Sequence, residues 1–282
     1  MYQKSNSILF IFLFFCVFAK GQSTIINDSL LPLPVDFQFT ISGKFSFVTS
    51  DDAGNIYGIN TSGRFIKYNS NGDSLTAYNE VLRFGKPVSA DVSNPFKILL
   101  VYQRIPSVSL LDRQLSFQGN IPFRQKGLIN VNAISASYDN RIWLFNQQQF
   151  TLQKYDDVFT LVQESNDVRQ LTDDAIVPGK IIDENNRVVL YDDQNGFYVF
   201  DYYGNFQTKI PFLHWYDVCV HDEKYVGRIN DTLHVYDRTQ FLERVYSLPV
   251  SGKINSMYIS HDKLMISDQT GILVYKIQQP IF

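Results

Sequence analysis

A polar ending recurs along the chain at nearly constant spacing, and it restricts the fold more than any other sequence feature. Alternating apolar runs, most of them with an aromatic residue, end at Asn69, Asp112, Asp156, Asp201, Asp237 and Lys276. The steps between these endings are 43, 44, 45, 36 and 39 residues. A second marker has the same phase, namely short Asp-, Asn- or Gly-containing turns at 51–55, 93–95, 138–141, 183–187, 221–224 and 261–263. Two markers with one period indicate six copies of one structural unit.

The apolar pattern within each unit is that of β-strands. Apolar residues alternate with polar ones in short runs such as 45–48, 56–59 and 150–155, which is a period of two. The 23 Phe and 17 Tyr residues favour strands as well. Short strands in units of about 40 residues are typical of propeller blades. The sequence therefore predicts an all-β chain that forms a single six-bladed β-propeller.

The recurring ending marks the third strand of each blade, where Asp or Asn starts the turn into the fourth strand by accepting bonds from nearby backbone amides. Blade four then has strands over 180–183, 187–192, 197–201 and 205–211. The last unit is one strand short, while Val35–Ile41 is a spare strand before the first unit. An N-terminal strand that completes the last blade would close the ring and remove two open sheet edges.

With these features the chain resembles the six-bladed β-propellers of the NHL and TolB-like kind over residues 30–280. The resemblance rests on blade length, on the Asp51–Asn55 turn and on the aromatic-Asp endings. Proteins of this architecture serve as binding scaffolds, lectins, lactonases and lyases. The resemblance thus implies a fold and a set of possible functions.

The N-terminus predicts export. Residues 8–18 are an unbroken apolar run, too short to span a bilayer, and Ala19-Lys20-Gly21 fits a secretory cleavage site. We expect a signal peptide over 1–21 and a propeller domain over 22–282, with no transmembrane segment in the mature chain. The alternative is a lipoprotein signal with Cys16 as the modified residue. The expected location is the periplasm or the cell surface.

Charge and cysteine content exclude some functions. The mature chain would keep 23 basic and 28 acidic residues, and a net charge of −5 without a basic cluster argues against nucleic-acid binding. Only Cys219 would remain, so no internal disulfide can form. Its apolar neighbours predict a buried, inert thiol.

No catalytic, metal or cofactor signature accompanies the repeats. The acids Asp51, Asp52, Asp139, Asp183, Glu184, Asp222, Glu223 and Asp262 fall in or beside predicted turns. The histidines, at positions 214, 221, 234 and 261, lack metal-type spacing. Lactonase-like propellers carry a metal held in the channel by carboxylates and Asn, and we interpret the acids here as turn residues instead. We predict no catalytic residues, no metal and no cofactor.

Two features are candidates for ligand binding. Leu213–Asp217 gathers polar aromatic residues, so Trp215 and Asp217 could line a pocket, or Trp215 could pack between blades. Gly-Lys recurs before the innermost strand of four blades, with lysines at Lys44, Lys86, Lys180 and Lys253. These lysines would surround one channel mouth and attract an anion. The alternative is that glycine makes the turn and lysine is merely solvated.

Two classes of function follow. The first is a non-catalytic scaffold of the cell envelope that binds an envelope protein or an anionic glycan, as a monomer within a larger complex. The second is a hydrolase or lyase that works in the channel. The absence of a catalytic signature favours the first.

Overall fold

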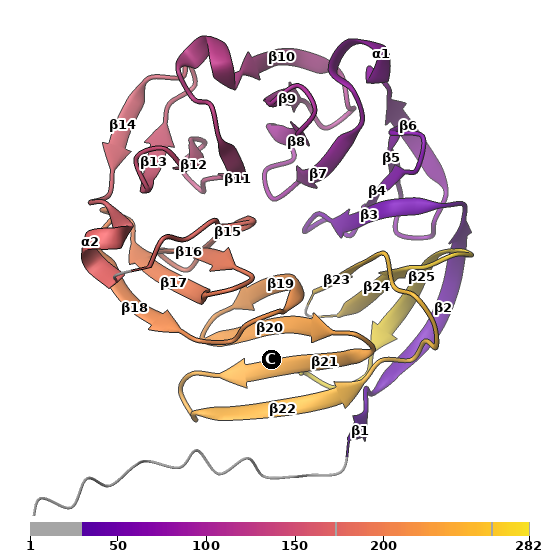
Figure 1. The fold of residues 1–282 in the computed structure, drawn as a ribbon. Helices are drawn as coiled ribbons and strands as arrows, with labels where there is room; N and C mark the ends of the chain where they lie inside the picture. The colour runs from indigo at the N-terminus through magenta and orange to yellow at the C-terminus, as the bar shows by residue number, and fades with distance from the viewer. Residues whose placement is uncertain (1–29, 173, 261, 282) are drawn as a thin grey trace, which may run out of the picture.

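The computed structural model describes residues 30–172, 174–260 and 262–281. They form a ring of six β-sheets around a central axis (Figure 1). The expected signal peptide over 1–21, with Cys16, lies outside the described residues. In the described part of the chain, no helix has the length and apolar character needed to cross a bilayer. The predicted six-bladed propeller is confirmed.

Each blade has four antiparallel strands, and in the first five blades these strands follow one another outward from the axis. The first three blades are built from β3(Phe45–Ser50), β4(Ile56–Asn60), β5(Phe65–Tyr68), β6(Ser74–Tyr78); β7(Pro87–Asp91), β8(Ile98–Tyr102), β9(Ser107–Leu111), β10(Phe117–Pro122); and β11(Val131–Ala136), β12(Ile142–Asn146), β13(Thr151–Tyr155), β14(Leu161–Glu164). The fourth and fifth are built from β15(Lys180–Glu184), β16(Arg187–Asp192), β17(Gly196–Asp201), β18(Phe206–Ile210); and β19(Tyr216–His221), β20(Lys224–Ile229), β21(Thr232–Asp237), β22(Leu242–Ser247). Three short helices, α1(Val81–Phe84), η1(Phe123–Lys126) and α2(Val168–Thr172), connect blades.

The sixth blade joins the two ends of the described chain. Its strands are β23(Ser256–Ile259), β24(Lys263–Ser267) and β25(Gly271–Ile277), and β2(Val35–Ser42) adds antiparallel to β25 as the outermost strand. The predicted closure by the N-terminal strand is therefore confirmed. The structure adds β1(Leu31–Pro32), which the sequence did not predict and which pairs in parallel with β22 of the fifth blade.

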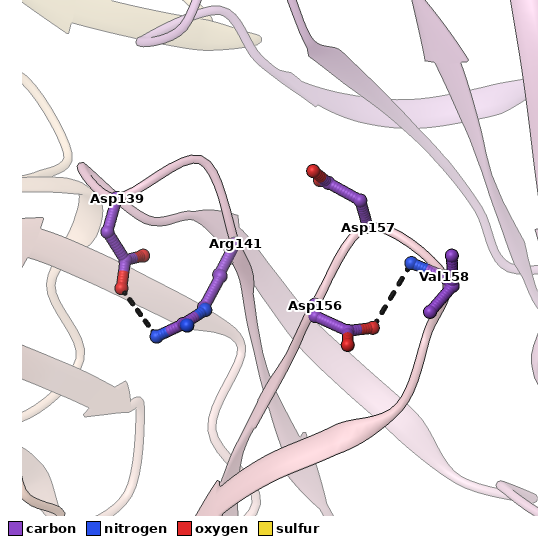
Figure 2. A pocket seen from close by; sticks show the side chains of 5 residues that line it. All are labelled: Asp139, Arg141, Asp156, Asp157 and Val158. Atoms are coloured by element: carbon purple, nitrogen blue, oxygen red, sulfur yellow. Dashed lines mark hydrogen bonds and ion pairs between the residues drawn. The ribbon is translucent and has the colours of Figure 1, made fainter.

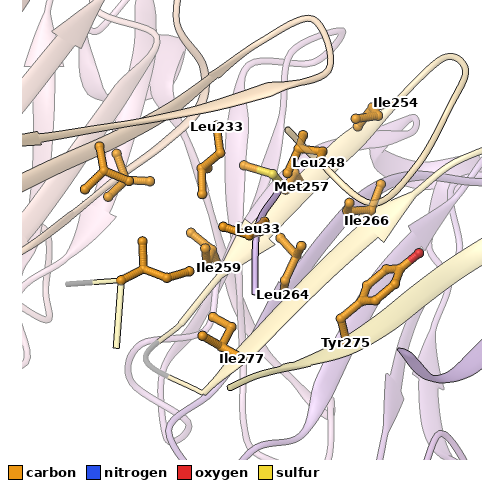
Figure 3. Packing of buried hydrophobic residues seen from close by; sticks show 13 residues of the cluster. Leu33, Leu233, Leu248, Ile254, Met257, Ile259, Leu264, Ile266, Tyr275 and Ile277 are labelled. Atoms are coloured by element: carbon orange, nitrogen blue, oxygen red, sulfur yellow. The ribbon is translucent and has the colours of Figure 1, made fainter. Parts of the chain in front are cut away.

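Six apolar clusters fill the spaces between neighbouring blades. The cluster between blades five and six contains Leu233, Ile259, Leu264 and Ile277 (Figure 3). Leu33, which follows β1, is buried in it. The N-terminal segment thus contributes to an inter-blade core as well as to two sheet edges.

The recurring polar ending has the predicted role. The Oδ1 atom of Asp201 accepts hydrogen bonds from the backbone amides of Tyr203, at 2.8 Å, and Asn205, at 2.9 Å. Asn69, Asp112 and Asp156 accept the same pair of bonds in their own turns. Local bonds of this kind compete with the ladder and end the strand.

One predicted turn is shorter than expected. Asp183, which the sequence placed both at the end of the strand 180–183 and at the start of the turn 183–187, belongs to strand β15 together with Glu184, and only Asn185 and Asn186 form the turn. The strand continues because Asp183 pairs with Val188 in the ladder, while the Asp183 carboxylate accepts bonds from Trp143 and Tyr202 on blades three and four. These contacts hold Asp183 in the sheet.

The connectivity defines two faces of the ring. Every inner strand begins on one face, which also carries the hairpins between second and third strands, and we call it the lysine face. The turns that join the first strand to the second and the third strand to the fourth lie on the opposite face, which we call the turn face.

Candidate functional site

The four Gly-Lys pairs lie where inner strands begin. Lys44 and Lys86 directly precede β3 and β7, Lys180 is the first residue of β15, and Lys253 lies shortly before β23. Since the inner strands of all blades surround the axis (Figure 1), the four lysines lie on the lysine face. This is the arrangement that the sequence pattern requires for a shared site, although it does not establish one.

The glycines of these pairs have a backbone reason. Gly43, Gly85 and Gly252 have φ values of 141°, 85° and 130°, a region that L side chains rarely adopt. The alternative interpretation therefore accounts for three of the four glycines, but Gly179 has no such backbone conformation. It does not account for the lysine that follows each of them, because the turn places no demand on that side chain.

Two of the lysines converge on one hairpin of blade one. The backbone amide of Thr61 donates to the carbonyl of Lys44 at 2.9 Å, and the Nζ atom of Lys86 donates to the carbonyl of Thr61 at 2.5 Å. The stem of Lys86 also lies against Gly63. The four lysine side chains form no ion pair with any carboxylate in the described part of the chain.

The two faces differ in charge. The described connections of the lysine face, together with the Gly-Lys pairs, carry ten basic residues: Lys44, Arg64, Arg83, Lys86, Arg104, Arg124, Lys126, Arg169, Lys180 and Lys253. Against these stand six acids in the connections, Glu80, Asp167, Asp174, Asp193, Asp231 and Asp268, and two acids that end strands on the same face, Glu164 and Asp192. The described connections of the turn face hold ten acids, Asp51, Asp52, Asp73, Asp112, Asp139, Asp156, Asp157, Asp222, Glu223 and Asp262, and four bases, Lys97, Arg113, Arg141 and Arg238. An acidic protein thus presents one basic face.

Trp215 and Asp217 have structural partners. Trp215 is buried, stacks on Phe212 at a centroid distance of 4.7 Å, and lies so close to Gly227 that a side chain there would collide with it. Asp217 lies at a bulge in β19 and has a φ of 53°. Its Oδ2 atom accepts from Nε of the buried Arg228 at 2.9 Å. Trp215 therefore packs between blades, and Asp217 anchors an arginine.

Cys219 lies on the inner strand β19. Burial raises the pKa of its thiol to about 12, although Lys180 opposes that rise. The thiol is therefore protonated at neutral pH and is a poor nucleophile. Tyr258 of β23 is half-buried, as Cys219 is, and burial together with nearby charges that include Asp52 and Asp91 raises the pKa of its hydroxyl.

The histidines and acids do not gather in a common site. His234 contacts Glu243 at 2.7 Å and His214 lies 3.4 Å from Asp193, both close to their own strands. In residues 30–281, leaving aside positions 173 and 261, no three His, Cys, Asp or Glu side chains have a metal-binding arrangement.

A recess of about 340 Å³ opens on the turn face of blade three. Figure 2 shows the two loops that line it, with Asp139 bonded to Arg141 and Asp156 bonded to the amide of Val158. Asp139 also accepts from Lys154 at 2.7 Å. The carboxylates of Asp139 and Asp156 thus already have partners in the protein. We therefore interpret the recess as a gap between two hydrogen-bonded turns and not as a ligand site.

The sequence reasoning missed a cluster of polar side chains between blades two and three. Asn146, Gln148, Gln149, Gln153 and Glu164 line a second recess, of about 370 Å³, toward the lysine face. The only sequence signal was the glutamine-rich stretch 146–153, which interrupts the apolar alternation.

Sequence comparisons give no family. No protein-family model and no curated protein matches the chain. Solved structures do match: a streptogramin B lyase, at 12% identity over 86% of this chain and 96% of that one, has a TM-score of 0.58. The Pan2 WD40 domain of Neurospora crassa, at 10% identity over 85% and 90%, has a TM-score of 0.59.

A catalytically inactive virginiamycin B lyase from Staphylococcus aureus, in a structure with quinupristin, matches at 12% identity over 87% of this chain and 88% of that one, with a TM-score of 0.56. At such identities the likeness concerns the fold alone. The geometry and these matches identify the chain as a six-bladed β-propeller.

Proposed function

We propose that the protein is an exported, non-catalytic binding scaffold of the cell envelope, and that its lysine face receives an envelope protein or an anionic glycan. The observation that carries the proposal is the charge difference between the faces in a chain whose net charge is −3. The basic face of an acidic protein attracts an anionic partner, while the acidic remainder of the surface repels it. The two effects together orient the molecule toward that partner.

The lysines support this role by their freedom from ion pairs. On the turn face, Lys97, Arg141 and Arg238 are already paired with carboxylates. Lys44, Lys180 and Lys253 are exposed and keep their charge available for a ligand. Their individual contributions are small, about 1 kcal/mol or less each, because water screens exposed charges.

The alternative is a hydrolase or lyase that works in the channel. Two lyases share the fold, but likeness at 12% identity does not carry activity. Metal analysis of the purified protein separates the alternatives, since a stoichiometric divalent ion would favour the enzyme.

The experiment is a change of all four lysines, Lys44, Lys86, Lys180 and Lys253, to glutamine. We expect weaker binding to a panel of acidic glycans, or to the envelope partner recovered by crosslinking, and a flatter dependence of the dissociation constant on salt. The unfolding temperature should change little, because these side chains are exposed.

The matched control removes the same charge from other surfaces by changing Arg113, Arg244, Lys263 and Lys276 to glutamine. This control should bind as the wild type does. Equal affinity of the wild type and the four-lysine variant at low and high salt would contradict the proposal.

A further inference from the structure

The recess between blades two and three lies apart from the inner strands that carry the four lysines. It is about 370 Å³ in volume, within the range of small-molecule sites. Blade three supplies polar side chains from β12, β13, β14 and the β12–β13 hairpin, the end of η1 supplies Lys126, and the connection after it supplies Gly127 and Leu128. The recess therefore combines hydrogen-bonding groups with an apolar floor.

Gln153 is the unusual residue of this recess. Counted from the polar ending, the same place in the third strand is held by Ile66, Tyr198 and Leu273 in blades one, four and six, and by the polar residues Ser109 and His234 in blades two and five. In the described chain, blade three alone has a carboxamide at this place. Gln153 is 2% exposed. A buried carboxamide is costly unless every polar atom has a partner, so its presence here needs a reason other than packing.

A hydrogen-bond network satisfies Gln153 and fixes its neighbours. Its Nε2 atom donates to Gln149 Oε1 at 2.8 Å and to Glu164 Oε1 at 2.6 Å. Its Oε1 atom accepts from the Tyr155 hydroxyl at 2.9 Å. Asn146 Nδ2 donates to Gln149 Oε1 at 2.7 Å, and Thr151 donates to Glu164 Oε1 at 2.8 Å.

Gln149 and Glu164 each use one polar atom of the side-chain end in this network, and the other polar atom remains available. Gln149 Nε2, a double donor, and Glu164 Oε2, an acceptor, have no hydrogen-bond partner in the described part of the chain. Both residues are exposed, while their other ends are held by buried partners. They are thus rigid, planar groups that present a donor and an acceptor to the recess.

We infer that this recess binds a hydroxyl-rich ring, that is, one sugar unit of a glycan. Neighbouring hydroxyls each donate and accept, so they match a fixed amide donor next to a carboxylate acceptor. The apolar face of the ring would lie on Leu128 and Leu161. Lys126 also lines the recess, but a phosphate or sulfate bound there would lie against the Glu164 carboxylate, and an apolar ligand would leave the amides unpaired. This inference goes beyond the proposed function, because it uses none of the four Gly-Lys lysines.

The test uses the full chain and a panel of methyl glycosides of neutral hexoses and N-acetylhexosamines. Saturation-transfer NMR detects binding, and calorimetry gives the dissociation constant, which we expect near 1 mM for a single sugar unit in an open recess. Glu164→Gln replaces one acceptor by a donor and should weaken binding about tenfold. Gln153→Leu introduces the residue type found at this place in blade six. It removes the amide that holds Gln149 and Glu164 and should abolish binding.

Two controls keep the result interpretable. Glu80→Gln makes the same chemical change on the same face outside the recess and should bind sugars as the wild type does. The four-lysine variant should bind them unchanged as well, so this inference and the proposed function can fail separately. Near-UV circular dichroism confirms that each variant is folded. No saturation transfer to any glycoside, or unchanged affinity in Glu164→Gln, would overturn the inference.

Discussion

At the residue scale, the interface between blades three and four buries a charged side chain among aromatic rings. Lys154 has a side chain only 4% exposed and bonds to Asp139 at 2.7 Å. Its Nζ atom lies 4.7 Å from the centre of the Trp143 ring and 5.1 Å from that of Tyr202. The rings and the carboxylate together replace the water that the ammonium group loses.

Lys154→Met should destabilise the protein by about 2–3 kcal/mol, because it leaves a half-buried carboxylate with Arg141 alone. Lys67 holds the same place in blade one, where its Nζ atom donates to the Arg113 carbonyl at 3.0 Å and lies over the Tyr57 ring, and it has no carboxylate partner among the described residues. Lys67→Met should therefore cost about 1 kcal/mol. Urea unfolding of both variants measures the difference, and a larger cost at Lys67 would contradict this account.

Asp183 gives a pH dependence at the same interface. Burial raises the pKa of its carboxyl, even though Tyr202 and Trp143 donate hydrogen bonds that lower it. The folded-state pKa thus lies above the unfolded value of about 3.9. Folding favours the protonated form, so the contribution of this group to stability is greatest in acid and falls as pH rises through that window.

Asp183→Asn removes this titration. The free energy of unfolding of the wild type, minus that of the variant, should therefore decrease between pH 3.5 and pH 7, as measured by urea unfolding at each pH. Carboxylates whose pKa is lowered, such as Asp139 and Asp237, contribute stability that rises with pH. Both proteins contain them, so their contributions cancel in the difference. A difference that grows with pH would show that hydrogen bonding outweighs burial.

At the scale of the element, the turn after each third strand depends on one carboxylate or amide oxygen. Asp201 bonds two backbone amides. Burial tends to raise the pKa of its carboxyl, but the bonds with Asn205 and Tyr203 together outweigh burial and lower the pKa. Gly204, with a φ of 78°, completes the turn. The same left-handed position is held by Leu115 and Phe159 in blades two and three, so the side-chain oxygen stabilises a backbone that those residues rarely adopt.

Asp201→Ala should cost about 1 kcal/mol, since it removes bonds to two amides that water can partly replace. Asp201→Asn should cost less, because Asn69 makes the same bonds in blade one. Thermal unfolding of the two variants is the measurement. Equal losses would mean that charge, rather than the hydrogen-bond geometry, holds the turn.

At the scale of the whole molecule, the ring is closed by its N-terminal segment. β2 pairs with β25 from Val35 to Ser42, and β1 covers the edge of blade five. Without them, two blades would expose unpaired backbone groups and the cluster around Leu33 and Ile277.

Deletion of residues 22–41 should lower the unfolding temperature by about 10 °C or more, as a loss of several kcal/mol implies for a chain of this size. Deletion of residues 22–30 leaves both strands in place and is the control, which should unfold as the full chain does. Calorimetry distinguishes the two. An unchanged midpoint after the longer deletion would show that the ring closes without β2.

The sequence by itself determined the blades, their number and the closure by Val35–Ile41, because strand period and turn chemistry are local properties that each blade repeats. It also placed Lys44, Lys86, Lys180 and Lys253 at strand starts, since a repeat puts equal positions on one face. It could not tell whether Trp215 packs or binds, or that Trp143 donates to the carboxylate of Asp183, because those outcomes depend on the neighbouring blade. The pairing of β1 with β22 and the network around Gln153 were likewise decided only by the tertiary structure, where residues far apart in the chain meet and a polar group finds partners that no repeat encodes.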